Sequence, residues 1–351
     1  MKRRIFAVFL LAAFAFSLAA CGQQPSEPTT PASSAGPSAE PSAEPDAEGW
    51  VPDKMVTFMV PTGAGGSSDL FARKIAEIAE KYEFCPVSIN IENRSGGSST
   101  IGFSYLNSLR GGDLDNYTLG ITPPGFWTSP LSGVIDVYGI DDFAEVSAMA
   151  ADPLCVVVNS DSPFKTFSDV VEYAKEHPGE LKCLGGGQLS DETILTYMIN
   201  DLLGIELSYI TMTDGSNVLA AALGNHADLY ILNPADGAEH FTNGTLIPLA
   251  ISTEEPVESF EYIPTFVSQG YDIVHQQTRA LVMNSSVSQE VIDFFSDMLQ
   301  KVSETPEWEE YLTDSGLADI YLNSADFDEY NDELVASYEK YIAMVMEDRE
   351  E

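Results

Sequence analysis

Short apolar runs alternate with segments of helical spacing along most of the chain. Residues 55–60 and 117–121 are rich in β-branched and apolar side chains, a composition typical of buried strands. Between them, residues 69–82 carry Ile75 and Ile78 on one face of a predicted helix. The same criteria predict further strands at 87–92, 155–158, 181–184, 207–211, 229–232, 246–251 and 280–283, and helices at 100–109, 167–177, 190–203, 216–224, 289–302 and 325–346. This alternation predicts α/β domains with mainly parallel sheets.

The N-terminal segment has a different pattern. Basic residues at positions 2–4 precede an apolar run that ends in Leu-Ala-Ala-Cys at Cys21. The run is shorter than the roughly 20 residues that a transmembrane helix needs. We predict a lipoprotein signal peptide over residues 1–20, cleavage before Cys21, and a lipid on the Cys21 thiol that anchors the protein outside the cytoplasmic membrane. The alternative is an uncleaved membrane anchor whose cysteine is incidental.

Residues 21–49 form a segment of low complexity. They are mostly Pro, Ser, Ala, Glu, Thr and Gln, and the sequence Pro-Ser-Ala-Glu occurs at 37–40 and again at 41–44. Such a segment has no apolar surface to bury, so nothing offsets the entropy lost on ordering it. We predict a disordered tether between the lipid and a globular part that starts at Trp50, with a recognition tail as the alternative.

The charge of the chain restricts its partners. The formal net charge is −39, and it becomes −42 without the three basic residues of the predicted signal peptide. This field repels nucleic acid and anionic lipid head groups, so we exclude both as partners. An anionic ligand would have to be held by local dipoles against the overall potential.

The cysteines and histidines show no metal-ligand spacing. Besides Cys21 the chain has Cys85, Cys155 and Cys183, an odd number that excludes a fully paired disulfide framework. Cys155 and Cys183 lie in apolar runs, which leaves two alternatives, buried free thiols or a bridge between them. The histidines are scattered and are expected on the surface or in loops; they are His177, His226, His240 and His275. We predict no metal site.

Three junctions between a predicted strand and a predicted helix are rich in glycine and small polar residues. Backbone N–H groups at a helix start attract anions without any Lys or Arg. The candidate ligand-binding residues at these junctions are Gly65, Gly66, Ser67 and Ser68 in the first, Gln188 and Ser190 in the second, and Ser216 and Asn217 in the third. Dinucleotide, P-loop, serine-hydrolase and zinc-protease motifs are missing from the sequence, so we predict neither a cofactor nor an enzyme.

Several short motifs are spread over residues 54–346. They read Pro-Thr-Gly-Ala-Gly-Gly-Ser-Ser-Asp at 61–69, Glu-Asn-Arg-Ser-Gly-Gly at 92–97, Gly-Asn-His-Ala-Asp at 224–228, Leu-Ile-Pro-Leu-Ala at 246–250 and Ile-Pro-Thr-Phe at 263–266. In this order and spacing the chain resembles the solute-binding proteins of tripartite tricarboxylate transporters, the Bug-type extracytoplasmic receptors.

The resemblance implies a two-lobed Venus-flytrap fold of the type II periplasmic-binding-protein class, with two crossovers at the hinge. Lobe 1 would comprise residues 50–151 plus 274–351, and lobe 2 residues 152–273. A small organic carboxylate would be enclosed by lobe closure and delivered to the permease subunits of a membrane transporter. We expect a monomer. The alternatives are a sensory receptor of the same fold that presents its ligand to a membrane kinase, and a surface enzyme acting on anionic metabolites.

The chain departs from the family pattern near the expected ligand. Glu254 and Glu255 stand where the family often has a basic residue. Asp236 lies in a predicted loop of lobe 2, where a carboxylate would recognise an amine on the ligand. In the first junction, Asp69 is expected to cap its helix, and Asn93 and Arg94 to fix the neighbouring loop.

Overall fold

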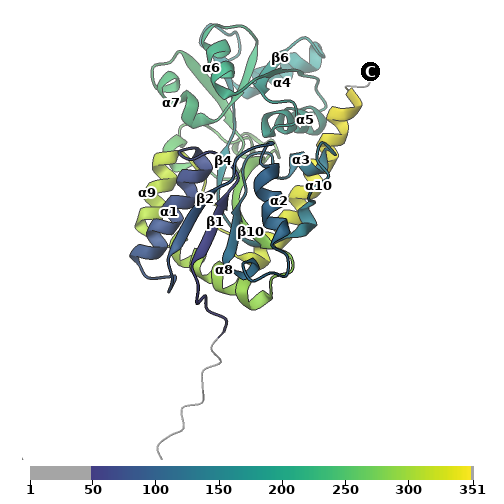
Figure 1. The fold of residues 1–351 in the computed structure, drawn as a ribbon. Coiled ribbons are helices and arrows are strands. Elements are labelled where there is room, and N and C mark those ends of the chain that lie inside the picture. The colour runs from purple at the N-terminus through teal and green to yellow at the C-terminus, as the bar shows by residue number, and fades with distance from the viewer. Residues whose placement is uncertain (1–48, 349–351) are drawn as a thin grey trace, which may run out of the picture. The chain divides into compact units, whose positions relative to one another are not determined.

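The computed structural model describes residues 49–348 of the 351-residue chain. The predicted signal peptide, Cys21 and nearly all of the predicted tether lie outside these residues. The described part folds into two five-stranded sheets with helices packed on both faces (Figure 1). Its helices are all too short or too polar to cross a membrane.

The first sheet has the strand order β2-β1-β3-β10-β4 and the second the order β7-β6-β8-β5-β9. The chain passes from the first sheet to the second between β4 and β5 and returns between β9 and β10. The strands are β1 (Val56–Val60), β2 (Ile89–Asn93), β3 (Thr118–Ile121), β4 (Phe143–Pro153), β5 (Cys155–Asn159), β6 (Lys182–Gly186), β7 (Ser208–Met212), β8 (Leu229–Leu232), β9 (Leu246–Ile251) and β10 (Gln276–Asn284).

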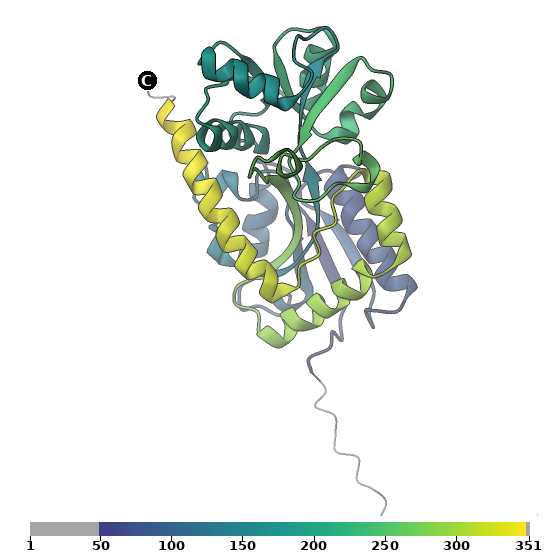
Figure 2. The same ribbon diagram turned by 180° about the vertical axis from the view of Figure 1, so that it is seen from behind.

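Most strands are followed by a helix that covers one face of a sheet. The helices are α1 (Ser67–Lys81), α2 (Thr100–Ser108), α3 (Thr128–Leu131), α4 (Phe167–Glu176), α5 (Asp191–Leu203), α6 (Gly215–Leu223), α7 (Pro234–Thr242), α8 (Gln289–Ser303), α9 (Pro306–Ser315) and α10 (Ser324–Asp348). Figure 2 shows from behind how α10 runs from the first sheet toward α5 beside the second.

Successive residues of each buried strand enter different hydrophobic clusters. In β1, Phe58 packs in the cluster formed with α1, α8 and α9, whereas Met59 packs in the cluster that contains α2 and α10. In β5, Val156 and Val157 are divided in the same way between two clusters. Side chains of a strand point alternately to its two faces, so each sheet is apolar on both sides and needs helices on both.

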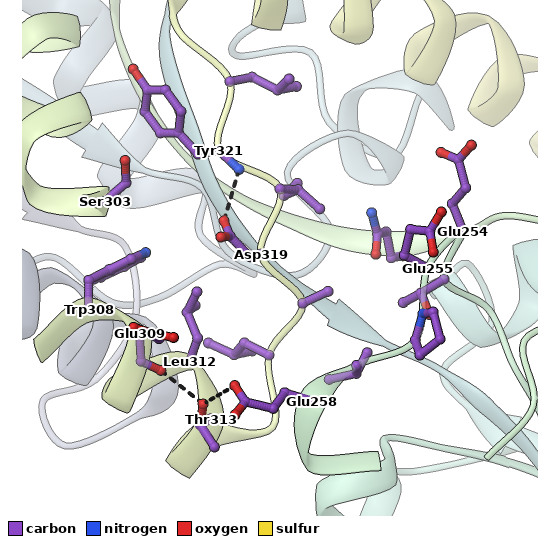
Figure 3. Close-up of a pocket in the computed structure, with 18 of the residues that line it drawn as sticks. Glu254, Glu255, Glu258, Ser303, Trp308, Glu309, Leu312, Thr313, Asp319 and Tyr321 are labelled. Atoms are coloured by element: carbon purple, nitrogen blue, oxygen red, sulfur yellow. Dashed lines mark hydrogen bonds between the residues drawn. The ribbon is translucent and has the colours of Figure 1, made fainter. Parts of the chain in front are cut away.

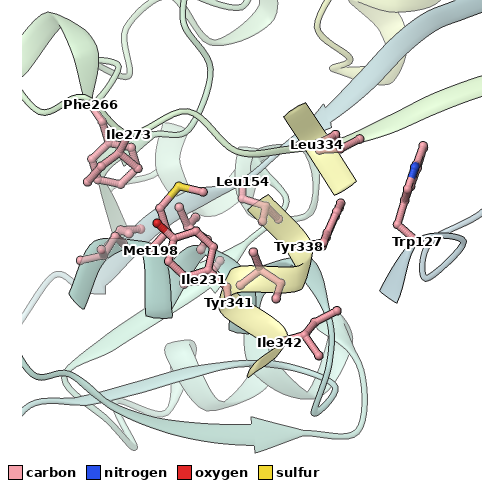
Figure 4. Packing of buried hydrophobic residues seen from close by; sticks show 14 of the residues in the cluster. Trp127, Leu154, Met198, Ile231, Phe266, Ile273, Leu334, Tyr338, Tyr341 and Ile342 are labelled. Atoms are coloured by element: carbon pink, nitrogen blue, oxygen red, sulfur yellow. The ribbon is translucent and has the colours of Figure 1, made fainter. Parts of the chain in front are cut away.

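One of these clusters continues from the first sheet to the second. Tyr338 and Tyr341 of α10 pack in it with Met198 of α5 and Ile231 of β8 (Figure 4). Tyr338 also stacks on Trp127, with ring centroids 6.3 Å apart and ring planes 5° from parallel. The C-terminal helix thus contributes to the core beside both sheets.

The predicted two-lobed α/β fold class is confirmed, but the prediction of mainly parallel sheets is wrong. Of the eight strand pairs, four are parallel and four antiparallel, because β10 and β5 each run against both neighbours. The long strand β4 went unpredicted since its sequence, Phe-Ala-Glu-Val-Ser-Ala-Met-Ala-Ala-Asp-Pro, contains several good helix formers. Burial between β10 and the helices overrides that propensity.

The cysteines in the described residues are buried free thiols. Cys155 lies in β5 and Cys183 in β6, and β8 separates these two strands in the sheet. The alternative of a bridge between them is therefore wrong. Burial raises the pKa of the Cys183 thiol to about 12, which leaves it unreactive at neutral pH.

A partly buried carboxyl group, that of Glu145, holds α10 against β4. Asn331 of α10 donates from Nδ2 to Oε1 of Glu145 at 2.7 Å, and its Oδ1 accepts from Trp127 Nε1 at 2.7 Å. Burial, with smaller contributions from the charges of Asp328 and Asp332, raises the pKa of Glu145 to about 7. The native chain therefore keeps this proton to a higher pH than the unfolded chain, whose carboxyl titrates near 4.5.

We expect Glu145→Gln to stabilise the protein at pH 8 and to leave it nearly unchanged at pH 4.5. A raised native pKa gives stability at low pH that is lost as pH rises from about 4.5 through 7, by up to about 3 kcal/mol for a shift of this size. Glutamine keeps the oxygen that Asn331 contacts but does not ionise. Urea titrations at both pH values measure the difference. Glu333→Gln, an exposed position on α10, is the control, and equal effects of the two variants at pH 8 would contradict the assignment.

Candidate functional site

The first glycine-rich junction forms the loop between β1 and α1. Gly65 has φ +81°, a left-handed conformation that favours glycine. Its backbone N–H donates to Oδ2 of Asp69 at 2.8 Å, and the N–H of Gly66 donates to the carbonyl oxygen of Gly63 at 3.3 Å. The donors of Gly65 and Gly66 are thus used within the loop, and the open first turn of α1 begins at Ser67.

Asp69 is the residue that holds this loop. It accepts from Arg73 through both carboxylate oxygens, at 2.9 and 3.0 Å, and from Asn93 Nδ2 at 3.0 Å. The Arg73 contact, followed by the bonds from Gly65 and Asn93, lowers the pKa of Asp69 to about 2 in spite of burial. Asn93 also donates to the carbonyl oxygen of Thr62 at 3.1 Å, so it fixes the loop as expected. Arg94 instead stacks on Tyr105, 3.3 Å from the ring centroid, and pairs with Glu92.

A buried ion pair lies beside the start of α1. Arg279 of β10 donates from Nε and Nη2 to the two carboxylate oxygens of Asp152, at 2.6 and 2.7 Å. Its remaining Nη1 donates to the carbonyl oxygen of Ser67 at 3.2 Å. The side chains of Arg279 and Asp152 are only 14% and 10% exposed. Since all three guanidinium nitrogens are engaged, Arg279 positions the helix start and its charge is neutralised locally.

These residues surround a small cavity of about 10 Å³ at the first sheet. Ser67 and Ser68 line it together with residues from β10 and from the end of β3, and with Asp152. The first turn of α1 supplies backbone N–H groups that have no partner within the helix. The cavity has room for about one water molecule, and hydroxyl groups, helix-start dipoles and a neutralised ion pair border it.

The second and third junctions lie side by side at the second sheet. Ser190 caps α5 by accepting from Thr193 N–H, and its hydroxyl donates to the carbonyl oxygen of Gly186. Asp214 caps α6 by accepting from Asn217 N–H at 3.0 Å. A Cβ added at Gly186 would lie 3.9 Å from the carbonyl carbon of Asp214, so the two loops approach closely. Gln188, Ser216 and Asn217 are exposed.

Acidic groups gather around these two loops. Burial raises the pKa of Glu192, whose side chain lies against Gly185 and Gly186 at the end of β6. Asp236 of α7 points toward Gly215, where its Oδ2 would be 3.4 Å from an added Cβ. Asp236 keeps solvent contact, but partial burial, followed by repulsion from Asp152, raises its pKa. The side of the site at the second sheet is thus more acidic than the glycine and serine content predicts.

The structure brings the candidate residues together as two groups. Ser67 and Ser68 lie beside Arg279 and Asp152 at the first sheet, with Gly65 and Gly66 in the loop before them. The remaining candidates lie in or beside the loops that start α5, α6 and α7 at the second sheet. Asp236 and Asp152 belong to different groups, and repulsion between them adds to the effect of burial on the pKa of Asp236. Sequence reasoning missed Arg279, although an arginine in the apolar run that forms β10 is a signal for a buried, paired charge.

A buried polar cluster lies next to Ser190. Asp191 accepts from Gln277 Nε2 at 3.0 Å and from the hydroxyl of Tyr338, and it is 3.2 Å from His275 Nε2. Burial alone would raise the pKa of Asp191, but the bonds from His275, Tyr338 and Gln277 lower it. His275 lies in the loop before β10, as one of the two expected alternatives has it, but this loop is buried, and His275 is only 4% exposed. The cluster joins α5, α10 and the start of β10.

Comparisons with known proteins show the family of this chain. Residues 71–345 match the profile of the family described as tripartite tricarboxylate transporter family receptor. A Cupriavidus necator protein called the UPF0065 protein in the gbd 5′ region is 25% identical, over 81% of this chain and 85% of its own.

Two solved structures share the fold. A TctC solute-binding protein from Polaromonas has a TM-score of 0.75 at 21% identity and covers 84% of this chain and 99% of its own. R. palustris Rpa4515, solved with adipate, has a TM-score of 0.65 at 24% identity and covers 84% and 98%. The chain belongs to the tripartite tricarboxylate transporter receptor family, a family of extracytoplasmic solute-binding proteins.

Proposed function

We propose that this protein captures a small organic carboxylate between two lobes and delivers it to a tripartite membrane transporter. The observation that carries the proposal is the open first turn of α1, with Ser67 and Ser68 beside the paired Arg279. The adipate in the R. palustris structure supports a carboxylate as the ligand class. The family match supports a transporter as the recipient.

The proposed ligand is held by neutral dipoles. Lobe 1, over 50–151 and 274–351, would offer the backbone N–H groups and hydroxyls of Ser67 and Ser68. Lobe 2, over 152–273, would offer the backbone N–H groups of Ser190 and Ser216 and the side-chain amides of Gln188 and Asn217, at the starts of α5 and α6. Charge-assisted hydrogen bonds from such donors are about twice as strong as neutral ones. Gly65 and Gly66 act as positioning residues, because their own N–H groups are bonded within the loop.

Closure of the two lobes would bring the donors together. The chain crosses between the sheets after β4 and before β10, and Asp152 and Arg279 lie at these crossings. The ligand would then be shielded from water, which strengthens each polar contact to it. We further propose that the lipid on Cys21 and the tether up to residue 49 keep the monomeric receptor near its transporter.

The ligand we propose also carries an amine. Asp236 and Glu192 face the loops that hold Ser190 and Ser216, and a plain carboxylate would be repelled by them. An ammonium group paired with Asp236 would remove this repulsion and favour the ionised form of the acid. The preferred class is therefore an amino-carboxylate.

A carboxylate ligand should raise the melting temperature of the compact unit Ala47–Glu351. A ligand at 100 times its dissociation constant adds about 2.7 kcal/mol of stability, a shift of several degrees for a chain of this size. Thermal melting against mono-, di- and tricarboxylates and acidic amino acids identifies the ligand. Ser67→Ala should weaken the binding of this ligand about tenfold, because a hydrogen bond to a charged group is lost.

The matched control for Ser67→Ala is Ser288→Ala. Ser288 is an exposed residue at the start of α8 and makes no capping hydrogen bond through its side chain. Its replacement should leave the ligand-induced shift unchanged. Equal shifts in wild type, Ser67→Ala and Ser288→Ala would place the ligand elsewhere, and a flat response of folded, ligand-free protein to the whole panel would reject the carboxylate.

The amine makes a separate prediction. Asp236→Asn should weaken an amino-dicarboxylate at least tenfold while leaving a plain dicarboxylate of the same length unchanged or tighter, because one attraction and one repulsion are removed. Calorimetric titration of aspartate against succinate measures both. Exposed Glu239 lies on the same helix, and Glu239→Gln is the control. Equal losses for the two ligands would show that Asp236 does not contact the amine.

A further inference from the structure

A much larger cavity lies away from the start of α1. It has a volume of about 870 Å³ and is lined by the loop after β9, by the end of α8, by α9, and by the segment that follows α9 (Figure 3). Its lining includes Gln276 of β10 in the first sheet and the loop that follows β9 of the second. Gln276 lines this cavity, whereas its neighbour Gln277 lines the small cavity at Ser67. Adjacent residues of a strand point to opposite faces, so β10 separates the two spaces.

The charge of this cavity is of one sign. Its lining includes six acids, namely Glu254, Glu255, Glu258, Glu304, Glu309 and Asp319, and no Lys, Arg or His. The hydroxyl of Thr313 donates to Glu258 at 2.9 Å. All six acids are exposed to solvent, and Asp319 lies on the segment that follows α9. In the described part of the chain, none of them belongs to an ion pair.

The deeper wall carries polar atoms without partners. The indole Nε1–H of Trp308 and the hydroxyl of Thr253 are buried, in residues only 1% and 3% exposed, and neither has a hydrogen-bond partner. The carbonyl oxygen Oε1 of Gln276 is unpartnered as well. In Figure 3 the indole nitrogen lies at the edge of the Trp308 ring that faces Asp319. Buried unpaired donors and acceptors are costly, so such a set on one cavity wall indicates a ligand.

These groups define the chemistry of the ligand. Carboxylates around the opening require cationic groups. Trp308 Nε1–H can only donate, so it requires an acceptor oxygen, and Gln276 Oε1 requires a donor. A metal ion does not fit, because the described residues hold no group of three or more His, Cys, Asp or Glu side chains arranged to bind one. The volume lies within the range of ordinary small-ligand pockets, about 300–1,000 Å³.

We propose that this cavity is a second binding site, for an organic polycation that also carries carbonyl oxygens, of which a short basic peptide is the simplest form. Its ammonium or guanidinium groups pair with Glu254, Glu255 and Glu258. A carbonyl oxygen of its backbone accepts from Trp308, and a backbone N–H donates to Gln276. The site differs from the carboxylate site in the sign of the charge that it selects.

Isothermal titration of the compact unit Ala47–Glu351 with trilysine in 150 mM salt tests the proposal. We expect saturable binding of one trilysine, no binding of triglutamate, and weaker binding of spermidine, which has cationic groups but no carbonyl oxygen. The triple variant Glu254→Gln, Glu255→Gln, Glu258→Gln should weaken trilysine at least tenfold. These three side chains are exposed, so their replacement leaves the core intact.

The matched control removes three charges elsewhere. Glu172→Gln, Glu176→Gln and Glu180→Gln alter exposed residues in and just after α4 and should change trilysine affinity less than twofold. Trp308→Phe should weaken the binding of trilysine but not that of spermidine. Because Trp308 also packs on Phe71, circular dichroism is used to check that this variant folds. Absence of trilysine binding at millimolar concentration, equal losses in both triple variants, or spermidine binding as tightly as trilysine would each overturn the proposal.

Discussion

The ion pair between Arg279 and Asp152 connects the parts on which the site depends. Asp152 stands near the end of β4 and Arg279 in β10, the two strands through which the chain leaves and re-enters the first sheet. The two strands are paired, with Asp152 opposite Gln277 and Arg279 opposite Ala150, and the guanidinium group reaches on to the carbonyl oxygen of Ser67. Removing one partner of a buried pair leaves an uncompensated charge, which typically costs 3–5 kcal/mol. The same contact that joins the crossings therefore also fixes the start of α1.

A strongly acidic protein can receive an anion when every charge near the anion is already paired. Asp69 is neutralised by Arg73, and Arg279 by Asp152, so the field at Ser67 and Ser68 is dominated by backbone dipoles. Two acids without a basic partner lie on the opposite side of the proposed ligand, and Asp236 is close enough to Asp152 for the two to repel each other. Asp236 and Glu192 lie at the second sheet, and the exposed glutamates after β9 lie around the larger cavity. The overall charge of −39 thus says little about either site.

Much of the fold was predictable because buried strands and amphipathic helices have strong periodic signals. The strands Leu229–Leu232 and Leu246–Ile251 have the predicted bounds. Most helices begin and end within two residues of the bounds predicted for them. Strand β4 was not predictable from propensity, since only its pairing with β10 makes an alanine-rich segment extended. Helix α7 was also missed, although Pro234 at its first position is a recognised start signal.

The site was harder to predict than the fold. Glycine and serine at strand-to-helix junctions indicated three loops, but periodicity cannot show which donors a loop uses internally. Gly65 is such a case, because its N–H is bonded to Asp69 four residues later. Arg279 and Asp152 are 127 positions apart, and their pairing follows from sheet topology alone.

The most direct test is an NMR titration of the ¹⁵N-labelled compact unit with the carboxylate that stabilises it best. If backbone dipoles from both lobes hold the ligand, the amide signals of Ser67 and Ser68 shift together with those of Ser190 and Ser216, at one common ligand concentration. Shifts confined to one of the two groups, or amides at Ser67 and Ser68 that stay unchanged while the ligand binds, would contradict a carboxylate held between the starts of α1, α5 and α6.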